Sequence, residues 1–165
     1  MRYSPLRYPG GKGKIAKFMK QFVKENFDEL PVYIEPYAGG AEIALTLLIE
    51  GYVKKVWIND KDYGIYCLWL SILNDTKQFI NKIEETPLDI STWRKQKDIY
   101  INQEKHTKLE VGFATFYLNR CNFSGVIKGG PIGGIKQTGK WKIDARFNKK
   151  DLIQRIERIA LHKNN

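Results

Sequence analysis

The sequence has 165 residues, of which 42% are hydrophobic, and this is enough for one domain with a substantial core. Lysine and arginine outnumber aspartate and glutamate by 28 to 18, so the formal net charge is +10. That excess favours nucleic acid as a partner, although a basic protein that is merely soluble has the same balance. No apolar run reaches 18 residues, which excludes a membrane-spanning helix, and residues 1–5 lack the apolar core of a signal peptide. The two distant cysteines, Cys67 and Cys121, indicate reduced thiols in the cytoplasm, and the two histidines lack companions at metal-ligand spacing, so we expect no metal site.

The first stretch with a functional signal is the loop from Ser4 to Lys14, which contains two prolines and three glycines. Within it, Gly10-Gly11-Lys12 precedes an amphipathic helix that begins near Ile15. A glycine loop with a lysine at a helix start resembles a phosphate cradle, but the Ser or Thr of a Walker A loop does not follow. A lysine there can equally approach a ligand carboxylate, and Tyr8 offers an aromatic face nearby.

The pattern strand, glycine turn, helix occupies residues 32–48. Val32-Tyr33-Ile34 predicts a buried strand, Glu35 to Gly40 a tight turn, and Ala41 onward a helix. In open α/β sheets a nucleotide-like ligand lies outside the carboxyl end of such a strand, where glycines let the backbone approach it. The dinucleotide pattern G-x-G-x-x-G is absent, and Glu35 at the strand end suits a cationic or hydroxyl-rich ligand better than a pyrophosphate.

A second acid follows the next predicted strand, Lys55 to Asp60. Asp60 lies 20 positions after Gly40 (60 − 40), the offset at which an acid accepts hydrogen bonds from ribose hydroxyls. A generic βαβ unit with an acid at a strand end fits the same spacing equally well.

The rest of the chain is predicted to be mostly helical. Apolar positions from Ile65 to Ile83 predict two helices, separated at residues 74–76, with a capping box formed by Asp75 and Gln78. A polar helix is expected over residues 91–104, an apolar one over 109–118, and a last one from about Lys149. Residues 129–139 are too glycine-rich for a packed element; their lysines and neighbouring aromatics favour a nucleic-acid backbone, and a disordered surface loop is an equal alternative.

Together these stretches resemble the DNA adenine methylase family, the S-adenosylmethionine-dependent, adenine-specific DNA methyltransferases. Four segments match in the family's order over nearly the whole chain. They are Arg7-Tyr8-Pro9-Gly10-Gly11-Lys12, Glu35-Pro36-Tyr37-Ala38-Gly39-Gly40, Ile58-Asn59-Asp60, and Phe116-Tyr117-Leu118-Asn119-Arg120 with Asn122-Phe123-Ser124-Gly125.

The resemblance implies an α/β fold: a Rossmann-like methyltransferase core with an incomplete sheet and an inserted, largely helical DNA-recognition region. Residues 1–76 would form the first part of the core, 77–147 the recognition region, and 148–165 a helix returning to the core. S-adenosylmethionine is the implied cofactor and double-stranded DNA the implied partner. The implied cofactor-binding residues are Tyr8, Lys12, Glu35, Tyr37, Gly39 and Asp60, and the implied DNA-binding residues are Arg120, Asn122, Lys128 and Lys136.

One departure from the family pattern concerns catalysis. The family's Asp-Pro-Pro-Tyr motif holds the target amine and stacks on the flipped base, and the six prolines of this sequence include no adjacent pair. We therefore expect an N-terminal fragment that is inactive alone, with an unpaired sheet edge that invites self-association. The alternatives are a non-catalytic DNA-binding remnant of such an enzyme and, on Gly10-Gly11-Lys12, a phosphate-binding protein.

Overall fold

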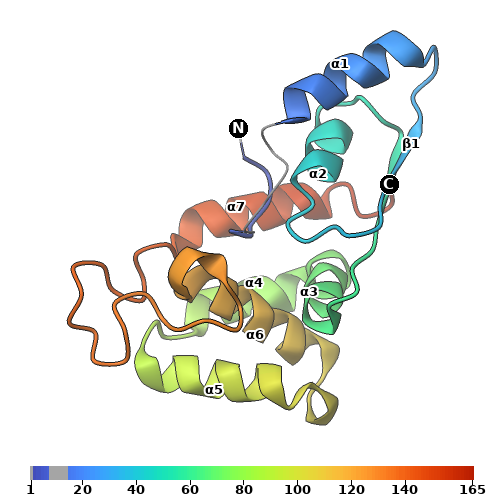
Figure 1. The fold of residues 1–165 in the computed structure, drawn as a ribbon. Coiled ribbons are helices and arrows are strands. Elements are labelled where there is room, and N and C mark those ends of the chain that lie inside the picture. Colours follow the sequence, from blue (N-terminus) through green and yellow to red (C-terminus); the bar gives the residue numbers. More distant parts are fainter. Residues whose placement is uncertain (1, 8–14) are drawn as a thin grey trace.

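The computed structural model describes residues 2–7 and 15–165, and in these residues it contains seven α-helices and two strands (Figure 1). Within this part of the chain, no helix has the length and apolar character needed to cross a membrane. In chain order the elements are α1 (Ala16–Asn26), β1 (Val32–Glu35), α2 (Glu42–Ile49), β2 (Lys55–Ile58), α3 (Tyr63–Asn74), α4 (Thr76–Glu85), α5 (Ile90–Ile101), the 3-10 helix η2 (Gln103–Lys105), α6 (Lys108–Cys121), the 3-10 helix η3 (Phe123–Gly125) and α7 (Lys149–Ala160).

The two strands are parallel neighbours, and α2 connects them. Their register runs from Val32 opposite Lys55 to Glu35 opposite Ile58. The pairing continues past the strand ends, because the Asn59 amide donates to the Glu35 carbonyl over 3.1 Å. The predicted βαβ unit and the mixed α/β class are therefore confirmed, while a larger Rossmann-like sheet is not seen in the described residues.

The prediction that β1 is buried is wrong for one of its two faces. Val32 and Ile34 are 43% and 63% exposed, and Trp57 beside them on β2 is 60% exposed. Successive side chains of a strand point to opposite faces, and only the face of Tyr33 and Val56 packs against apolar side chains of α2. We call Val32, Ile34 and Trp57 the apolar sheet face.

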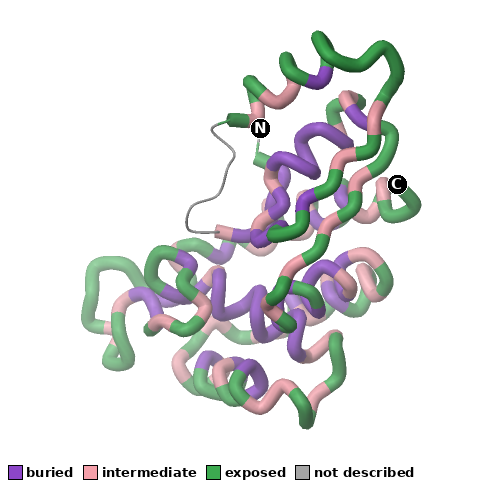
Figure 2. The backbone as a smooth tube through the Cα atoms, turned by 45° about the vertical axis from the view of Figure 1, so that its right-hand side comes forward, coloured by how far each residue is buried: buried purple, intermediate pink, exposed green. Residues whose placement is uncertain are grey.

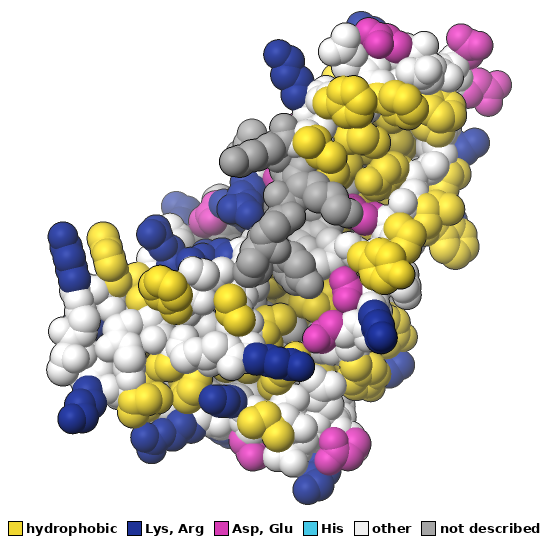
Figure 3. Space-filling view, viewed as in Figure 1, with side chains coloured by type: hydrophobic (Ala, Val, Ile, Leu, Met, Phe, Trp, Pro, Cys, Tyr) yellow, Lys and Arg dark blue, Asp and Glu magenta, His cyan; other side chains and the backbone are white. Residues whose placement is uncertain are grey.

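Helix α1 extends this exposed apolar surface. Only Val23 of α1 is buried, whereas Phe18 and Phe22 are exposed and stack on each other with ring centroids 6.2 Å apart. Figure 3 shows the resulting group of apolar side chains over α1 and the strands.

The main core lies among α3, α4, α6 and α7 (Figure 2). Phe116 of α6 packs its ring against Phe79 of α4 and Phe147, with centroids 5.4 and 5.5 Å apart. The same cluster of buried side chains includes Leu6 and Leu152. This core contains residues from both sides of the predicted domain boundary between residues 76 and 77.

Two predictions about helix ends are wrong. Asp75 makes no capping hydrogen bond with its side chain, since α3 ends at Asn74 directly before α4 and the Thr76 hydroxyl donates to the Ile72 carbonyl instead. The polar helix α5 stops at Ile101, and the expected residues up to Glu104 belong partly to the separate turn η2.

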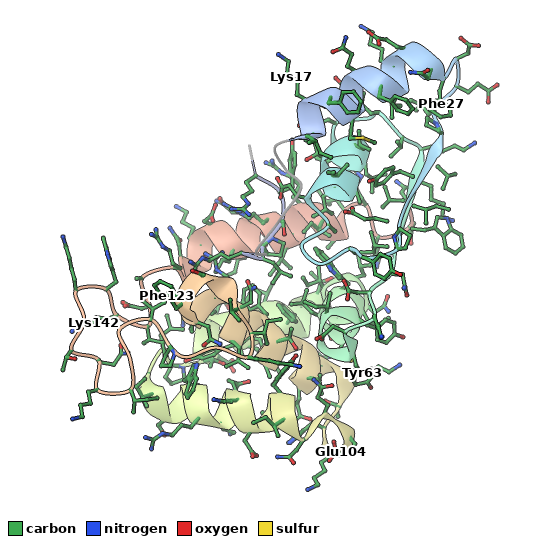
Figure 4. The ribbon with its side chains drawn as sticks, in the orientation of Figure 1. Lys17, Phe27, Tyr63, Glu104, Phe123 and Lys142 are labelled. Atoms are coloured by element: carbon green, nitrogen blue, oxygen red, sulfur yellow. The ribbon has the colours of Figure 1, made fainter. Side chains whose placement is uncertain are left out.

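Residues 129–139 form no helix or strand, as predicted. They belong to a longer glycine-rich loop, residues 126–148, that is anchored to the body of the protein. Ile132, Ile143 and Phe147 are buried, and Asn122 pairs with Pro131 as an isolated bridge. The loop extends from one side of the helical half of the molecule, with Lys142 near its outer end (Figure 4).

Candidate functional site

The carboxyl ends of β1 and β2 meet at the Asp60 carboxylate. Its Oδ2 accepts a hydrogen bond from the Gly39 amide over 2.7 Å, and its Oδ1 accepts one from the Asp62 amide over 2.9 Å. Gly39 has φ +48°, in the left-handed region where glycine is favoured. The glycine turn after β1 is thus tied directly to the acid after β2.

Glu35 lies beneath this turn, at the start of α2. The side chain is 4% exposed, and its Oε2 accepts from the Ala44 amide over 3.3 Å. A carboxylate is stabilised there by the free amides and positive end of the helix. Tyr37, in the same turn, is 74% exposed.

The structure therefore brings together four of the six predicted cofactor residues, Glu35, Tyr37, Gly39 and Asp60, around one turn. The other two predicted residues, Tyr8 and Lys12, lie outside the described residues.

Trp69 supports the turn from α3, a role that sequence reasoning missed. Its indole Nε1 donates to the Gly39 carbonyl over 2.9 Å. Trp69 and Asp60 also line a hollow of about 120 Å³ beside the ends of the strands. The helical spacing of Trp69 indicated only a core position, and no local signal pointed to its contact 30 residues away.

The segment 2–7 is clamped by the end of α6. The Asn119 Oδ1 accepts from the Arg7 amide over 2.8 Å, and its Nδ2 donates to the carbonyls of Arg7 and Gly125 over 3.1 and 2.9 Å. Gly125 has φ +76°, and an added Cβ would collide with the Arg7 carbonyl oxygen. Asn119 and Gly125 therefore fix the backbone that leads into the predicted cofactor loop.

Asn122, one of the four predicted DNA-binding residues, is fully buried. Its Oδ1 accepts from the Trp93 indole over 2.7 Å, and its Nδ2 donates to the carbonyls of Val126, Ile127 and Gly129. This amide supports the loop from inside and presents no group to a duplex, so we do not retain Asn122 as a DNA contact.

Arg120 is partly buried beside the N-terminal segment. Its guanidinium donates to the Pro5 carbonyl over 3.4 Å and to the Arg146 carbonyl. Burial, followed by the charges of Arg7 and Arg155, lowers the pKa of Arg120 to about 10. The remaining two predicted DNA-binding residues, Lys128 and Lys136, are exposed on the loop.

A larger pocket of about 450 Å³ lies between the start of α3, the end of α5 and the loop. Lys128 lines it together with Asp62, whose Oδ2 accepts from the Tyr100 hydroxyl over 3.2 Å. Exposed Lys128 of the loop thus shares a pocket with Asp62, two residues after Asp60.

A family model described as D12 class N6 adenine-specific DNA methyltransferase matches residues 8–165. The chain belongs to this family. The match covers the glycine turn, Asp60, Asn119 and the loop, and it confirms the resemblance from which the cofactor and the DNA were expected. A search of curated proteins gives no match.

The residues at the ends of β1 and β2 fit the S-adenosylmethionine that this methyltransferase family uses. Each oxygen of the Asp60 carboxylate accepts one backbone hydrogen bond and has further acceptor capacity, which suits a ribose diol.

Proposed function

We propose that this chain binds S-adenosylmethionine and DNA for methylation of the exocyclic amine of adenine. The single observation that carries the proposal is the hydrogen bond from the Gly39 amide to Asp60, because it joins the glycine turn to an acid at ribose-binding spacing.

In this proposal Asp60 accepts from the ribose hydroxyls, and Glu35, Tyr37 and Gly39 line the pocket near the methionine part of the cofactor. Tyr8 and Lys12 complete the site from the N-terminal loop, with Lys12 directed to the cofactor carboxylate. The Asn119 clamp on Arg7 supports this arrangement, since it fixes the residue directly before Tyr8.

The DNA contacts are proposed to come from residues 77–147, with Lys128 and Lys136 on the loop and Arg120 at its base. The exposed lysines suit phosphates, which supply most of the sequence-independent affinity for DNA. Exposed Phe123 lies on the same side of the molecule as Lys142 (Figure 4) and offers an aromatic face to a base.

When bound, the cofactor supplies an electrophilic methyl group, and the role of this chain is to position cofactor and DNA. The sequence contains no Asp-Pro-Pro-Tyr motif, so its own residues do not provide the groups that would hold the adenine amine. We therefore expect the 165-residue chain alone to transfer no methyl group.

The experiment measures the affinity for duplex DNA with and without S-adenosylmethionine, together with transfer of a labelled methyl group to the DNA. Cofactor and DNA binding without transfer is the expected result. DNA binding that is indifferent to the cofactor, with no cofactor binding by calorimetry, would favour the non-catalytic remnant. ATP binding without a response to S-adenosylmethionine would revive the phosphate-binding alternative.

We also propose that the chain associates with a second copy through the open edge of β1. The Glu35 carbonyl points toward β2. Backbone hydrogen-bonding groups of successive residues in a strand point to opposite sides, so those of Val32 and Ile34 point away from β2. In the described residues no strand pairs with them there. Paired edges of two copies would also join their apolar sheet faces.

A further inference from the structure

The N-terminal segment crosses α7 (Figure 1). Side chains of these two segments line a small arginine-rich hollow. Its volume is about 90 Å³. Among the described residues its lining includes three arginines but one carboxylate, and the full set is Arg2, Tyr3, Asp151, Gln154, Arg155 and Arg158. We call it the arginine hollow.

The single carboxylate is already engaged. Asp151 forms an ion pair with Arg155, with an N–O distance of 2.9 Å. Another nitrogen of Arg155 donates to the Ser4 carbonyl over 2.9 Å, but its Nε is buried and has no hydrogen-bond partner in the structure. Three guanidinium groups therefore line the hollow beside one carboxylate, so the lining carries a net positive charge.

The excess of positive charge extends to the arginines next to the hollow. The Nε of Arg120 is also buried without a partner. The charges of Arg7 and Arg155 lower the pKa of Arg120, after burial itself, and the charges of Arg146 and Arg2 likewise lower the pKa of Arg7. Positive groups are therefore crowded along a continuous path from the glycine-rich loop to α7.

We propose that the arginine hollow binds a phosphate group of the DNA backbone. Guanidinium groups match phosphate oxygens with paired hydrogen bonds, and a phosphodiester at the exposed Arg2 and Arg158 would supply negative charge to the hollow. The proposal rests on the DNA-binding function above and extends the DNA footprint from the loop to the N-terminal segment and α7.

The test leaves Arg120 and Arg155 unchanged, because their bonds to Pro5 and Ser4 hold the N-terminal segment in place. It uses the double variant Arg2→Gln/Arg158→Gln, which removes two charges from exposed positions of the hollow. The matched control, Lys17→Gln/Lys24→Gln, removes two charges from exposed positions of α1. Thermal unfolding of all three proteins establishes that they fold alike.

Fluorescence anisotropy then gives the affinity for a short duplex over a series of salt concentrations. We expect the arginine variant to lose about tenfold in affinity, as for a lost charge-assisted contact. We also expect its log–log salt slope to be shallower by about 0.9 for the lost phosphate contact. The lysine control should retain the wild-type slope.

If both double variants lost DNA affinity equally, the proposed phosphate site would be wrong, but the proposed DNA binding would be unaffected. A wild-type chain without affinity for duplex DNA would overturn both. Calorimetry with inorganic phosphate separates the two sources of the anion: saturable phosphate binding in the wild type, combined with unchanged DNA affinity in the arginine variant, would assign the hollow to free phosphate and overturn the assignment to DNA.

Discussion

At the scale of single residues, the site depends on a few side chains that hold distant backbone segments together. Asp60 ties the glycine turn to β2, Trp69 holds the same turn from α3, and Asn119 holds Arg7. The last two contacts span 30 and 112 positions of the sequence. Long-range hydrogen bonds of this kind have no local pattern, which is why spacing revealed Asp60 but not Trp69 or Asn119.

Gly125→Ala tests whether the clamp needs a glycine. The added Cβ would collide with the Arg7 carbonyl oxygen. In addition, alanine would have to adopt the left-handed backbone conformation that Gly125 has. We expect the free energy of unfolding to fall by more than about 2 kcal/mol, because the cost of the left-handed conformation adds to the cost of displacing the Arg7 backbone. Chemical denaturation measures it.

Two other glycines separate these causes. Gly51 has φ +75° with open space around its missing Cβ, so Gly51→Ala should cost about 1–2 kcal/mol for conformation alone. Gly130 has neither restriction and Gly130→Ala should change stability by less than about 0.5 kcal/mol. If Gly125→Ala were no more destabilising than Gly51→Ala, the close approach of Arg7 would not matter.

At the scale of elements, most helices followed from the sequence, because an apolar stripe at helical spacing is a local property. The last helix begins at Lys149, where it was expected. The burial of β1 did not follow, since it depends on which elements cover each face of the sheet. The sequence predicted a capping box at Asp75, whereas the structure has one at Thr107. Asp-x-x-Gln and Thr-x-x-Glu are equally good capping patterns, and the conformation of the residues before each one decides which of them forms.

The capping box at the start of α6 should make the stability of the protein depend on pH in the acid range. The Thr107 amide and hydroxyl donate to the Glu110 carboxylate over 2.9 and 2.8 Å and hold its pKa below the ordinary value of 4.5. The folded state therefore takes up this proton less readily than the unfolded state. The stabilisation is complete above pH 4.5 and is lost as the pH falls through the lower, folded-state pKa.

Glu110→Gln removes the titrating group and keeps its size. We expect the variant to lose less of its unfolding free energy than the wild type when the pH is lowered from about 5 to about 3. Urea denaturation at several pH values measures the difference, with Glu84→Gln, an exposed position of α4, as the control. Identical pH dependence in Glu110→Gln and the wild type would show that the capping box does not contribute.

At the scale of the whole molecule, the chain has two unlike surfaces. Lysines and arginines surround the loop and the N-terminal segment, whereas aromatic and aliphatic side chains of α1 and the sheet are exposed at the other end (Figure 3). Large exposed apolar patches on folded domains mark interaction sites. The net charge indicated the basic surface from the sequence, but the apolar one required the structure.

Ile34→Lys tests the proposed association through β1. A lysine on an edge strand is a common device against edge-to-edge pairing, so we expect light scattering to find the wild type partly dimeric and this variant monomeric. Leu161→Lys changes another exposed residue, 83% exposed after α7, and should associate like the wild type. A wild type that stays monomeric at high concentration would contradict the proposal.

The central claim is that S-adenosylmethionine binds where the glycine turn meets Asp60, and calorimetric titration of the cofactor into wild type and Asp60→Ala tests it most directly. Asp89→Ala is the control, because the Asp89 carboxylate also accepts a hydrogen bond from a backbone amide, that of Thr92, but lies at the start of α5. We predict that Asp60→Ala weakens cofactor binding by about 1.5–3 kcal/mol, typical of a lost charge-assisted hydrogen bond, and that Asp89→Ala binds like the wild type. Equal cofactor affinity in wild type and Asp60→Ala, or no binding to the wild type, would contradict the account.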